Sequence, residues 1–166
     1  KLAAKKRSKL SELIKSDAID VSIGIANEKE IDDLNILQAT FLAMKRAVGN
    51  LKITPEHLLI DGPHSNIKLF STDNIIKGDS RSLSIAAASI IAKVERDRIM
   101  CEYSKIYPEY SFDRHKGYGT KAHIENLEKF KATPIHRKSF RIVKSHLPDF
   151  NFYKKENLFA RLGSRI

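Results

Sequence analysis

Apolar residues recur at helical spacing along much of the chain. Between residues 31 and 48 they follow a period near 3.6 up to Gly49, and the preceding Asn27 and Glu30 have the spacing of a capping box. This pattern predicts a helix with a break near Asn35. Further helices are predicted over residues 2–15, 83–104 and 120–130, with a basic turn and a short helix over 134–143.

Two short runs have the character of β-strands. Residues 21–26 (VSIGIA) are rich in β-branched side chains, and residues 57–60 form an apolar run that ends at Asp61-Gly62. Residues 63–80 contain many turn formers around an apolar island at Ile75-Ile76, and residues 110–119 are predicted to form a loop. Strands that alternate with helices indicate an α/β fold, although two strands make a thin sheet. The helix over 83–104 has a face of small and β-branched residues suited to close packing on that sheet, namely Ile85, Ala88, Ile91 and Ala92.

Charge and composition narrow the classes of function. The 166 residues include 30 Lys and Arg against 20 Asp and Glu, and residues 84–166 carry most of the resulting excess of +10. Such a field attracts polyanions, of which nucleic acid is the commonest in a cell, although a basic surface can also serve solubility alone. A single cysteine excludes a disulfide framework within the chain. With no long apolar run and no secretory signal, we expect a cytoplasmic protein without membrane contact.

Three aspartates are candidates for metal chemistry. Asp61 follows an apolar strand, where the carboxyl ends of strands form the ligand crevice of an open α/β sheet, but Asp-Gly is also a favoured turn pair. Asp79 precedes the longest helix and could instead serve a polar loop. Asp97 lies on that helix and could be an ordinary solvated charge. Carboxylates that converge would suit Mg²⁺ or Mn²⁺, and a pair of such ions supports phosphodiester cleavage.

A second candidate lies in the segment HKGYGT, residues 115–120. Tyr118 stands between two glycines, so its ring can lie against a sugar or a base. His115 and Lys116 can meet phosphates, and the helix that begins after Thr120 offers a further anion site. The alternative is a loop tyrosine that packs on the core.

Five phrases of the sequence are similar to one known family. EIDDLNILQATFLAMKRAV, LLIDGP, IIKGDSRSLSIAAASIIAKVERDRIM, YPEYSFDRHKGYGTKAHIENL and TPIHRKSF together resemble bacterial ribonuclease HII. The resemblance covers residues 1–144, which we treat as one domain. Residues 145–166 lie outside it and form a basic tail with interleaved aromatic residues, a candidate for additional duplex contact.

The resemblance implies a ribonuclease-H-like α/β fold with a helical C-terminal part. It implies an endonuclease that cleaves the RNA strand of RNA–DNA hybrids and incises duplex DNA at embedded ribonucleotides, using two Mg²⁺ or Mn²⁺ ions held by four carboxylates. Two of the four map to Asp61 and Asp79, and Asp97 is a supporting candidate. The family's tyrosine at the ribonucleotide junction maps to Tyr118. The neighbouring candidates for nucleic-acid contact are His115, Lys116, Lys93 and Ser84, while Ser89 is expected to pack.

One departure from the family pattern is large. The family opens with a strand that carries adjacent Asp and Glu ligands and a Gly-Arg-Gly loop, and neither occurs in these 166 residues. The chain therefore resembles a member without its N-terminal strands, which predicts unpaired strand edges and exposed apolar surface. The alternatives to a monomeric active nuclease are a catalytically inactive, truncated nucleic-acid-binding fragment and an unrelated basic α/β protein.

Overall fold

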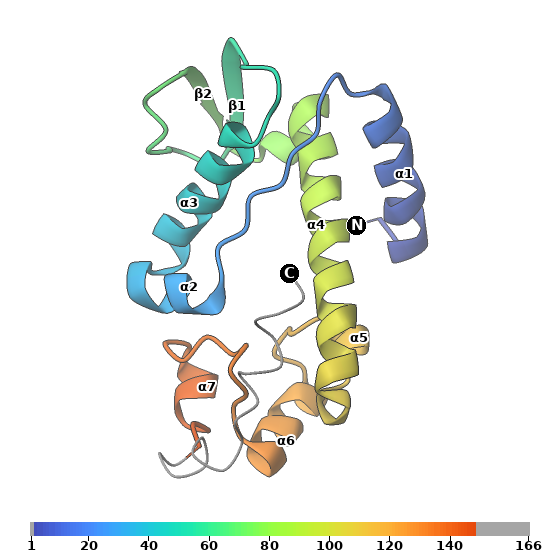
Figure 1. Ribbon diagram of the computed structural model, residues 1–166, viewed down its shortest axis with the longest axis vertical. Helices are drawn as coiled ribbons and strands as arrows, with labels where there is room; N and C mark the ends of the chain where they lie inside the picture. The colour runs from blue at the N-terminus through green and yellow to red at the C-terminus, as the bar shows by residue number, and fades with distance from the viewer. Residues whose placement is uncertain (1, 149–166) are drawn as a thin grey trace.

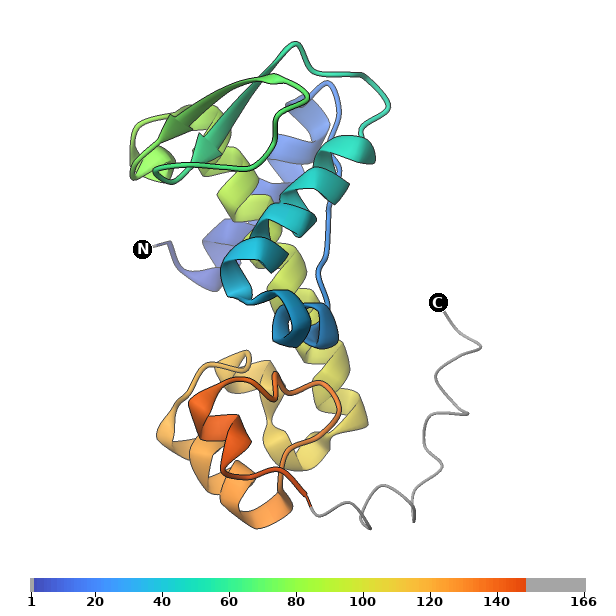
Figure 2. The same ribbon diagram turned by 90° about the vertical axis from the view of Figure 1, so that its left-hand side faces the viewer.

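The computed structural model describes residues 2–148. Helices lie beside and below a small two-stranded sheet at one end of the molecule, and residues 107–148 form a second group of helices, the lower lobe (Figures 1 and 2). The elements are, in chain order, α1 (Ala4–Asp17), α2 (Glu28–Leu34), α3 (Ile36–Gly49), β1 (His57–Asp61), β2 (Ser71–Ile75), the 3₁₀ turn η1 (Gly78–Ser80), α4 (Leu83–Ile106), the 3₁₀ turn η2 (Pro108–Tyr110), α5 (Phe112–His115), α6 (Lys121–Phe130) and α7 (Arg141–Lys144).

Helix α4 connects the two parts of the molecule. It begins where the Ser82 hydroxyl accepts the backbone N–H of Ile85, and it ends before Pro108. With 24 residues it is about 36 Å long. Its first half packs against α1, β1 and η1, and its last turns pack against α5 and η2 (Figure 1). The helix therefore carries residues of the sheet end and residues of the lower lobe on one rigid rod.

The predicted capping box and helix break are both confirmed. Asn27 accepts the N–H of Glu30, and the Glu30 carboxylate accepts the N–H of Asn27, each at 2.9 Å. At Asn35 the backbone turns to φ +72°, and the Asn35 side chain accepts the N–H groups of Leu37 and Gln38. The same residue thus ends α2 and starts α3, because asparagine tolerates the left-handed region and caps well.

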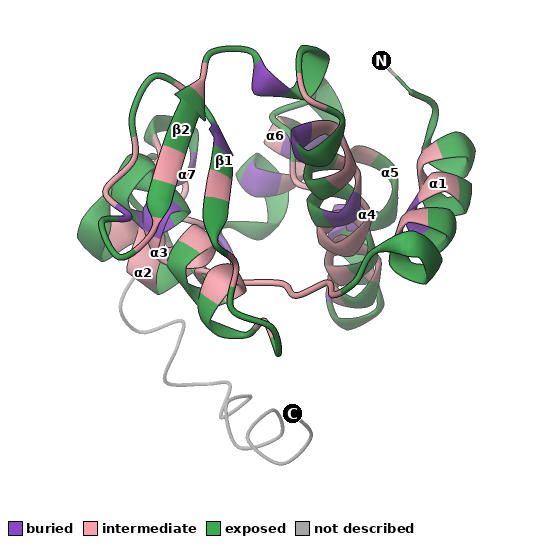
Figure 3. Ribbon diagram, turned by 90° about the horizontal axis from the view of Figure 1, so that it is seen from above, coloured by how far each residue is buried: buried purple, intermediate pink, exposed green. Residues whose placement is uncertain are grey.

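The sheet consists of β1 and β2 alone within the described residues. The strands are parallel, and the register pairs His57 with Ser71 and Asp61 with Ile75. Most of β2 lies in the stretch predicted as turn-rich, so that expectation is wrong for Ser71–Ile75. Its sequence, STDNI, is largely polar, and it forms a strand because its backbone pairs with β1 rather than because of intrinsic propensity. Figure 3 shows that both strands remain largely exposed or half-buried.

The strand predicted over residues 21–26 is not present. The segment runs along α3 without a strand partner, and α3 side chains bond its carbonyl groups: Arg46 donates to Ile25 and Asn50 donates to Ile23. Gly24 lies directly against the α3 backbone, so any side chain there would collide with it. A β-branched pattern yields a strand only when a neighbouring backbone completes the hydrogen-bond ladder.

An apolar cavity of about 730 Å³ separates this segment from β1. Its walls come from residues 20–24, α3, β1 and the first half of α4. On α4, Ile85 and Ile91 are buried, whereas Ala88 and Ala92 of the predicted packing face line the cavity and stay exposed. The expected open strand edge and exposed apolar surface are therefore both observed. A parallel sheet normally has both faces and both edges better covered than this one.

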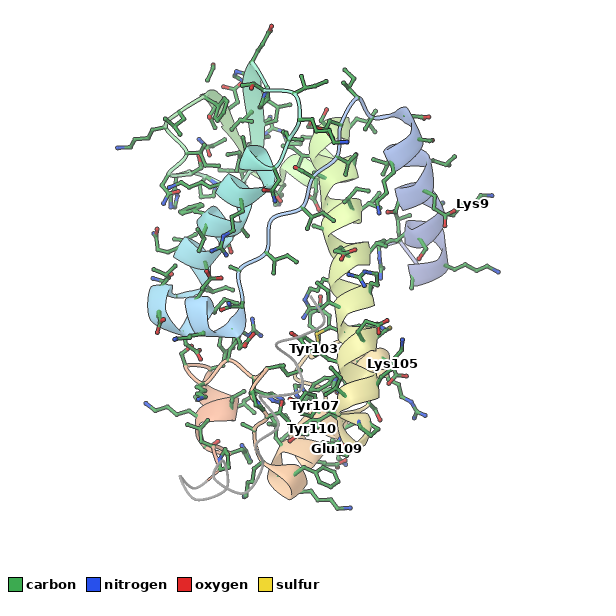
Figure 4. The ribbon with its side chains drawn as sticks, viewed as in Figure 1. Lys9, Tyr103, Lys105, Tyr107, Glu109 and Tyr110 are labelled. Atoms are coloured by element: carbon green, nitrogen blue, oxygen red, sulfur yellow. The ribbon has the colours of Figure 1, made fainter. Side chains whose placement is uncertain are left out.

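The most continuous hydrophobic cluster is in the lower lobe. Tyr107, which directly follows α4, and Tyr110, at the end of η2, point into it, whereas Lys105 points away from it (Figure 4). Tyr110 and Phe112 are at most 1% exposed and their rings stack at 5.1 Å. The cluster includes two residues predicted to lie in a loop, Tyr110, which instead ends η2, and Phe112, which begins the short helix α5. Its buried members are Tyr107, Tyr110, Phe112, Leu127, Ala132 and Val143.

Two expectations from the sequence concern the C-terminal tail and membrane contact. Residues 149–166, most of the predicted tail, lie outside the described residues, so its expected duplex contact stays a prediction. No helix between residues 2 and 148 is both long enough and apolar enough to cross a membrane.

Candidate functional site

Asp61 is the last residue of β1, and its carboxylate is held in place by backbone. Its Oδ1 accepts the N–H of Gly78 at 2.7 Å. The hydrogen bonding between β1 and β2 continues one residue beyond Asp61, because Gly62 N–H donates to the Ile75 carbonyl at 3.0 Å. One carboxylate oxygen is thus fixed while the residue as a whole remains exposed at the carboxyl end of the strand.

Asp79 follows Gly78 directly and lies in η1, just beyond the end of β2. Lys77 adopts φ +54° and turns the chain, and its carbonyl accepts the N–H of Ser80. The turn is tight: a Cβ on Gly78 would lie 2.5 Å from Ile85 Cδ1 and 3.4 Å from the Asp61 Cα. A side chain there would have to displace the end of the Ile85 side chain, and the turn brings Asp79 to a position next to Asp61 at the same edge of the sheet.

This pair has the chemistry of a hard-cation site. Both residues are exposed carboxylates, and among residues 2–148 no side chain bonds the carboxylate of Asp79. Mg²⁺ is commonly held by one or two carboxylates, with water and substrate phosphate completing its shell. The two carboxylates would therefore supply part of the ligand set of one such ion, and water and phosphate would supply the rest. No cluster of three or more His, Cys, Asp or Glu residues suited to a metal occurs within the described part of the chain.

Asp97 is not part of this pair. It lies about 21 Å along α4 from Leu83, because an α-helix rises about 1.5 Å per residue. Its Oδ2 accepts Arg7 Nη2 at 2.8 Å, and both side chains are less than one-fifth exposed. The contact ties α1 to α4, so the structure gives Asp97 a role in packing these helices.

Tyr118 lies beside the middle of α4, between the predicted site and the lower lobe. The residue is 51% exposed, and the Arg96 guanidinium lies 4.7 Å from the ring centroid. Lys93 Nζ donates to the Tyr118 hydroxyl at 3.3 Å, and this hydrogen bond to an ammonium lowers the pKa of Tyr118. Lys93 and Arg96 are three residues apart on α4 and so share a face. The result is an open aromatic ring flanked by two cations.

Two other predicted contact residues are engaged inside the protein. The Lys116 ammonium donates to the Cys101 thiol at 2.8 Å. The His115 ring stacks on His123 with centroids 4.6 Å apart, and both of its nitrogens bond backbone groups, those of Tyr110 and Gly117. These contacts hold the loop in shape, and they leave His115 without a nitrogen for a phosphate.

The two predicted serines lie near the start of α4. Ser84 is exposed in the first turn, where unpaired N–H groups favour anions. Ser89 lies one turn further and lines the apolar cavity together with Ser84.

Sequence reasoning missed Arg96, His123 and His136. Arg96 could have been found from its spacing to Lys93, which places both on the face of α4 that meets Tyr118. The two histidines are each 6% exposed and join through their Nε2 atoms at 3.0 Å. They are 13 residues apart with no motif between them, so only the folded lobe reveals their contact.

Comparison with known proteins gives a consistent result. The family model described as Ribonuclease HII matches residues 1–143. A protein named Ribonuclease HII from Clostridioides difficile strain 630 is 56% identical over 140 residues, which is 84% of this chain and 55% of that protein. A protein of the same name from Caldanaerobacter subterraneus subsp. tengcongensis is 54% identical over 143 residues, 84% of this chain and 58% of its own length. The chain thus spans little more than half the length of these relatives.

The fold also matches a solved structure, that of the ribonuclease H2 from Pyrococcus horikoshii OT3. The TM-score is 0.75 at 21% sequence identity, over 94% of this chain and 80% of that one. The structural likeness supports the α/β fold predicted from the sequence. With the family model matching 143 of its 166 residues, this chain belongs to the ribonuclease HII family.

Proposed function

We propose that this chain serves an endonuclease that cleaves the RNA strand of RNA–DNA hybrids and incises duplex DNA at embedded ribonucleotides. The observation that carries the proposal is the approach of Asp61 and Asp79 at the carboxyl ends of two neighbouring parallel strands, fixed by the bond from Gly78 N–H to Asp61. In open α/β sheets this edge is where ligands bind.

The proposed cofactors are two Mg²⁺ or Mn²⁺ ions, with Asp61 and Asp79 among their ligands. When bound, such ions activate water for attack on phosphorus and stabilise the charge on the leaving oxygen. The chain itself supplies rigid placement. Gly78 N–H orients one oxygen of Asp61, and the 3₁₀ turn fixes the backbone of Asp79 beside it, so both residues are placed before substrate arrives.

The proposed substrate contact lies along α4. Lys93 and Arg96 would neutralise backbone phosphates, and Ser84 would meet a phosphate at the N-terminus of the helix. The half-exposed ring of Tyr118 would pack against the sugar at the RNA–DNA junction. Aromatic rings and phosphate contacts position a strand, whereas a contact to the 2′-hydroxyl is needed to tell RNA from DNA.

A second candidate is binding of the hybrid without cleavage. The sequence favours it because only two of the four carboxylates implied by the family resemblance are present in these 166 residues. By contrast, the proposed contact residues Tyr118, Lys93 and Arg96 are all present in the described part of the chain and touch one another. The two candidates share the substrate and differ in chemistry.

The test is an incision assay with a DNA duplex that contains one ribonucleotide, incubated with the full chain in Mg²⁺ or Mn²⁺. An all-DNA duplex and a sample with EDTA serve as negative controls. Asp61→Asn removes one proposed ligand at nearly constant volume. Asp73→Asn, at an exposed position on the adjacent strand β2, is the matched control.

Incision that requires the ribonucleotide and the divalent ion, and that Asp61→Asn but not Asp73→Asn abolishes, would support the nuclease. Tight binding of the hybrid without any incision would favour the second candidate. Absence of both binding and incision would refute both.

A further inference from the structure

A buried pair of histidines lies beneath the loop that carries Tyr118. His123 is in the first turn of α6, and His136 is in the turn that follows Thr133. Each is 6% exposed, and they are packed among the rings of Tyr110 and Phe112. Neither belongs to the carboxylate site, and a buried pair of titratable side chains requires a physical explanation.

The hydrogen-bond donors around the pair fix where each proton lies. The N–H of Thr133 donates to His136 Nδ1 at 3.0 Å, so this nitrogen carries no proton, and the Thr133 hydroxyl, 2.8 Å away, then acts as a second donor to it. A neutral His136 therefore carries its proton on Nε2 and donates it to His123 Nε2, 3.0 Å away. His123 must then be protonated on Nδ1, from which it donates to the Tyr118 carbonyl at 3.0 Å. Every hydrogen bond in this series requires both imidazole rings to be neutral.

The Tyr118 loop is held from both sides by such contacts. The Tyr118 carbonyl accepts a second bond from Thr120 N–H at 2.7 Å, and Tyr118 N–H donates to the His115 carbonyl at 2.9 Å. Gly117 adopts φ +73° and donates its N–H to His115 Nδ1. Because the glycines on both sides of Tyr118 have little intrinsic backbone preference, these bonds decide where the ring lies.

We propose that His123 and His136 are positioning residues for nucleic-acid binding, acting as a neutral hydrogen-bond chain from Thr133 to the Tyr118 carbonyl that holds the Tyr118 ring in the orientation it presents to substrate. This inference rests on the proposed function, in which Tyr118 contacts the nucleic acid. Neither histidine touches substrate, and each acts through the loop.

Protonation of either ring breaks the chain. A proton added to His123 Nε2 would face the N–H of His136, and a proton added to His136 Nδ1 would face the N–H of Thr133 and require the Thr133 hydroxyl to turn and accept it. Two neighbours that face the pair, the Arg137 guanidinium and the His115 ring, oppose added positive charge. Burial is the main cause that lowers the pKa of both histidines, to about 4 for His136. The series of hydrogen bonds from Thr133 to Tyr118 is therefore intact at neutral pH and breaks in acid.

The test compares variants of the full chain that keep or remove the donor to Tyr118. His123→Asn places an amide N–H near the position of Nδ1 and cannot titrate, whereas His123→Ala removes the donor. His57→Asn, at the exposed start of β1, is the control for loss of a histidine elsewhere. Circular dichroism confirms that each variant is folded.

Two readouts are needed. Long-range ¹H–¹⁵N NMR spectra of the histidine rings report each tautomer, and the amide resonances of Gly117, Tyr118 and Gly119 report the loop from pH 7.5 down to pH 3.5. Fluorescence anisotropy with a labelled RNA–DNA hybrid in EDTA reports binding over the same range without cleavage.

We expect an Nδ1–H tautomer for His123 and an Nε2–H tautomer for His136 at pH 7.5. His123→Ala should weaken binding roughly tenfold, the scale of losing one stacked ring, and His123→Asn should restore most of it. In the wild type, binding and the loop resonances should change together as the histidines protonate, and His123→Asn should weaken this pH dependence.

The opposite tautomers, or a loop titration that His123→Asn leaves unchanged, would overturn the positioning role. If the wild type does not bind the hybrid at any pH, the proposed function falls. The ring tautomers and the loop resonances would still decide, independently of any substrate, whether the histidine chain holds the loop.

Discussion

The buried ring of His136 should make the folded state sensitive to mild acid. The imidazole is 6% exposed, and burial lowers its pKa from 6.5 to about 4, with the nearby His123 adding to the effect. In the unfolded chain the same ring protonates near pH 6.5. The unfolded state therefore binds more protons than the folded state between these two values.

The sign and size of the effect follow from this difference. Where the unfolded state binds more protons, the free energy of unfolding rises with pH. The contribution of His136 is thus fully present above pH 6.5 and is lost as the pH falls towards 4. Because one pKa unit corresponds to about 1.36 kcal/mol, the loss over the whole window is about 3 kcal/mol. That is a large share of the 5–15 kcal/mol typical of a folded domain.

His136→Gln is the perturbation that isolates this contribution. The amide keeps a donor near the position of Nε2 and does not titrate. Paired carboxylates also lose stability in acid, but Glu30, whose pKa the Arg46 hydrogen bond lowers to about 2, does so mainly below pH 4.5. These losses are common to both proteins and cancel in the difference between them.

The assay is urea unfolding of the wild type and of His136→Gln at several pH values from 4.5 to 7.5. We expect the wild type to be the more stable at pH 7.5, and we expect its advantage to shrink by about 2–3 kcal/mol at pH 4.5. A difference that stays constant over this range would refute the reasoning, because it would mean that His136 titrates alike in the folded and unfolded states.

Three further results are expected. Gly78→Ala should destabilise the protein by about 1–3 kcal/mol in urea unfolding, because the new Cβ would lie 2.5 Å from Ile85 Cδ1. Gly49→Ala, with no atom within 4 Å of the new Cβ, is the matched control and should cost nothing. Tyr118→Phe should bind an RNA–DNA hybrid nearly as well as the wild type, and Tyr118→Ala roughly tenfold more weakly, when measured by anisotropy. Lys93→Ala should reduce the slope of log affinity against log salt by about one, as expected for the loss of one phosphate contact.

Each of these has a clear contrary result. Equal stability of the two glycine variants would mean that the turn before α4 can relax. Equal binding by Tyr118→Ala and the wild type would remove the ring from the interface. An unchanged salt slope would place Lys93 away from the phosphates.

Local signals in the sequence determined the helices. Asn27 with Glu30, the break at Asn35, Ser82 before α4 and Thr120 before α6 each bond a backbone group two or three residues away. Such contacts form within one turn, so their residue types and spacing are sufficient to predict them. The ends of α1, α4 and α6 were accordingly predicted to within a few residues, whereas the short helix α5 was not predicted.

The strands depended on partners that the local pattern does not encode. The run VSIGIA has strong β character yet pairs with no strand, whereas the polar STDNI of β2 is a strand because β1 lies beside it. Strand pairing joins residues such as Asp61 and Ile75 through backbone groups, whatever their side chains are. The tertiary arrangement therefore decided which segment became the second strand.

The same distinction between local sequence and tertiary packing applies to the candidate site. The sequence by itself proposed Asp61, Asp79 and Tyr118 as candidates, because Asp61 ends an apolar run, Asp79 precedes the longest helix and Tyr118 stands between two glycines. Only the tertiary structure separated Asp97 from the carboxylate pair and joined His123 to His136. The physical reason is that a short phrase fixes the identity and local backbone of a residue, whereas its partners across the fold depend on how helices and loops far apart in the chain pack together.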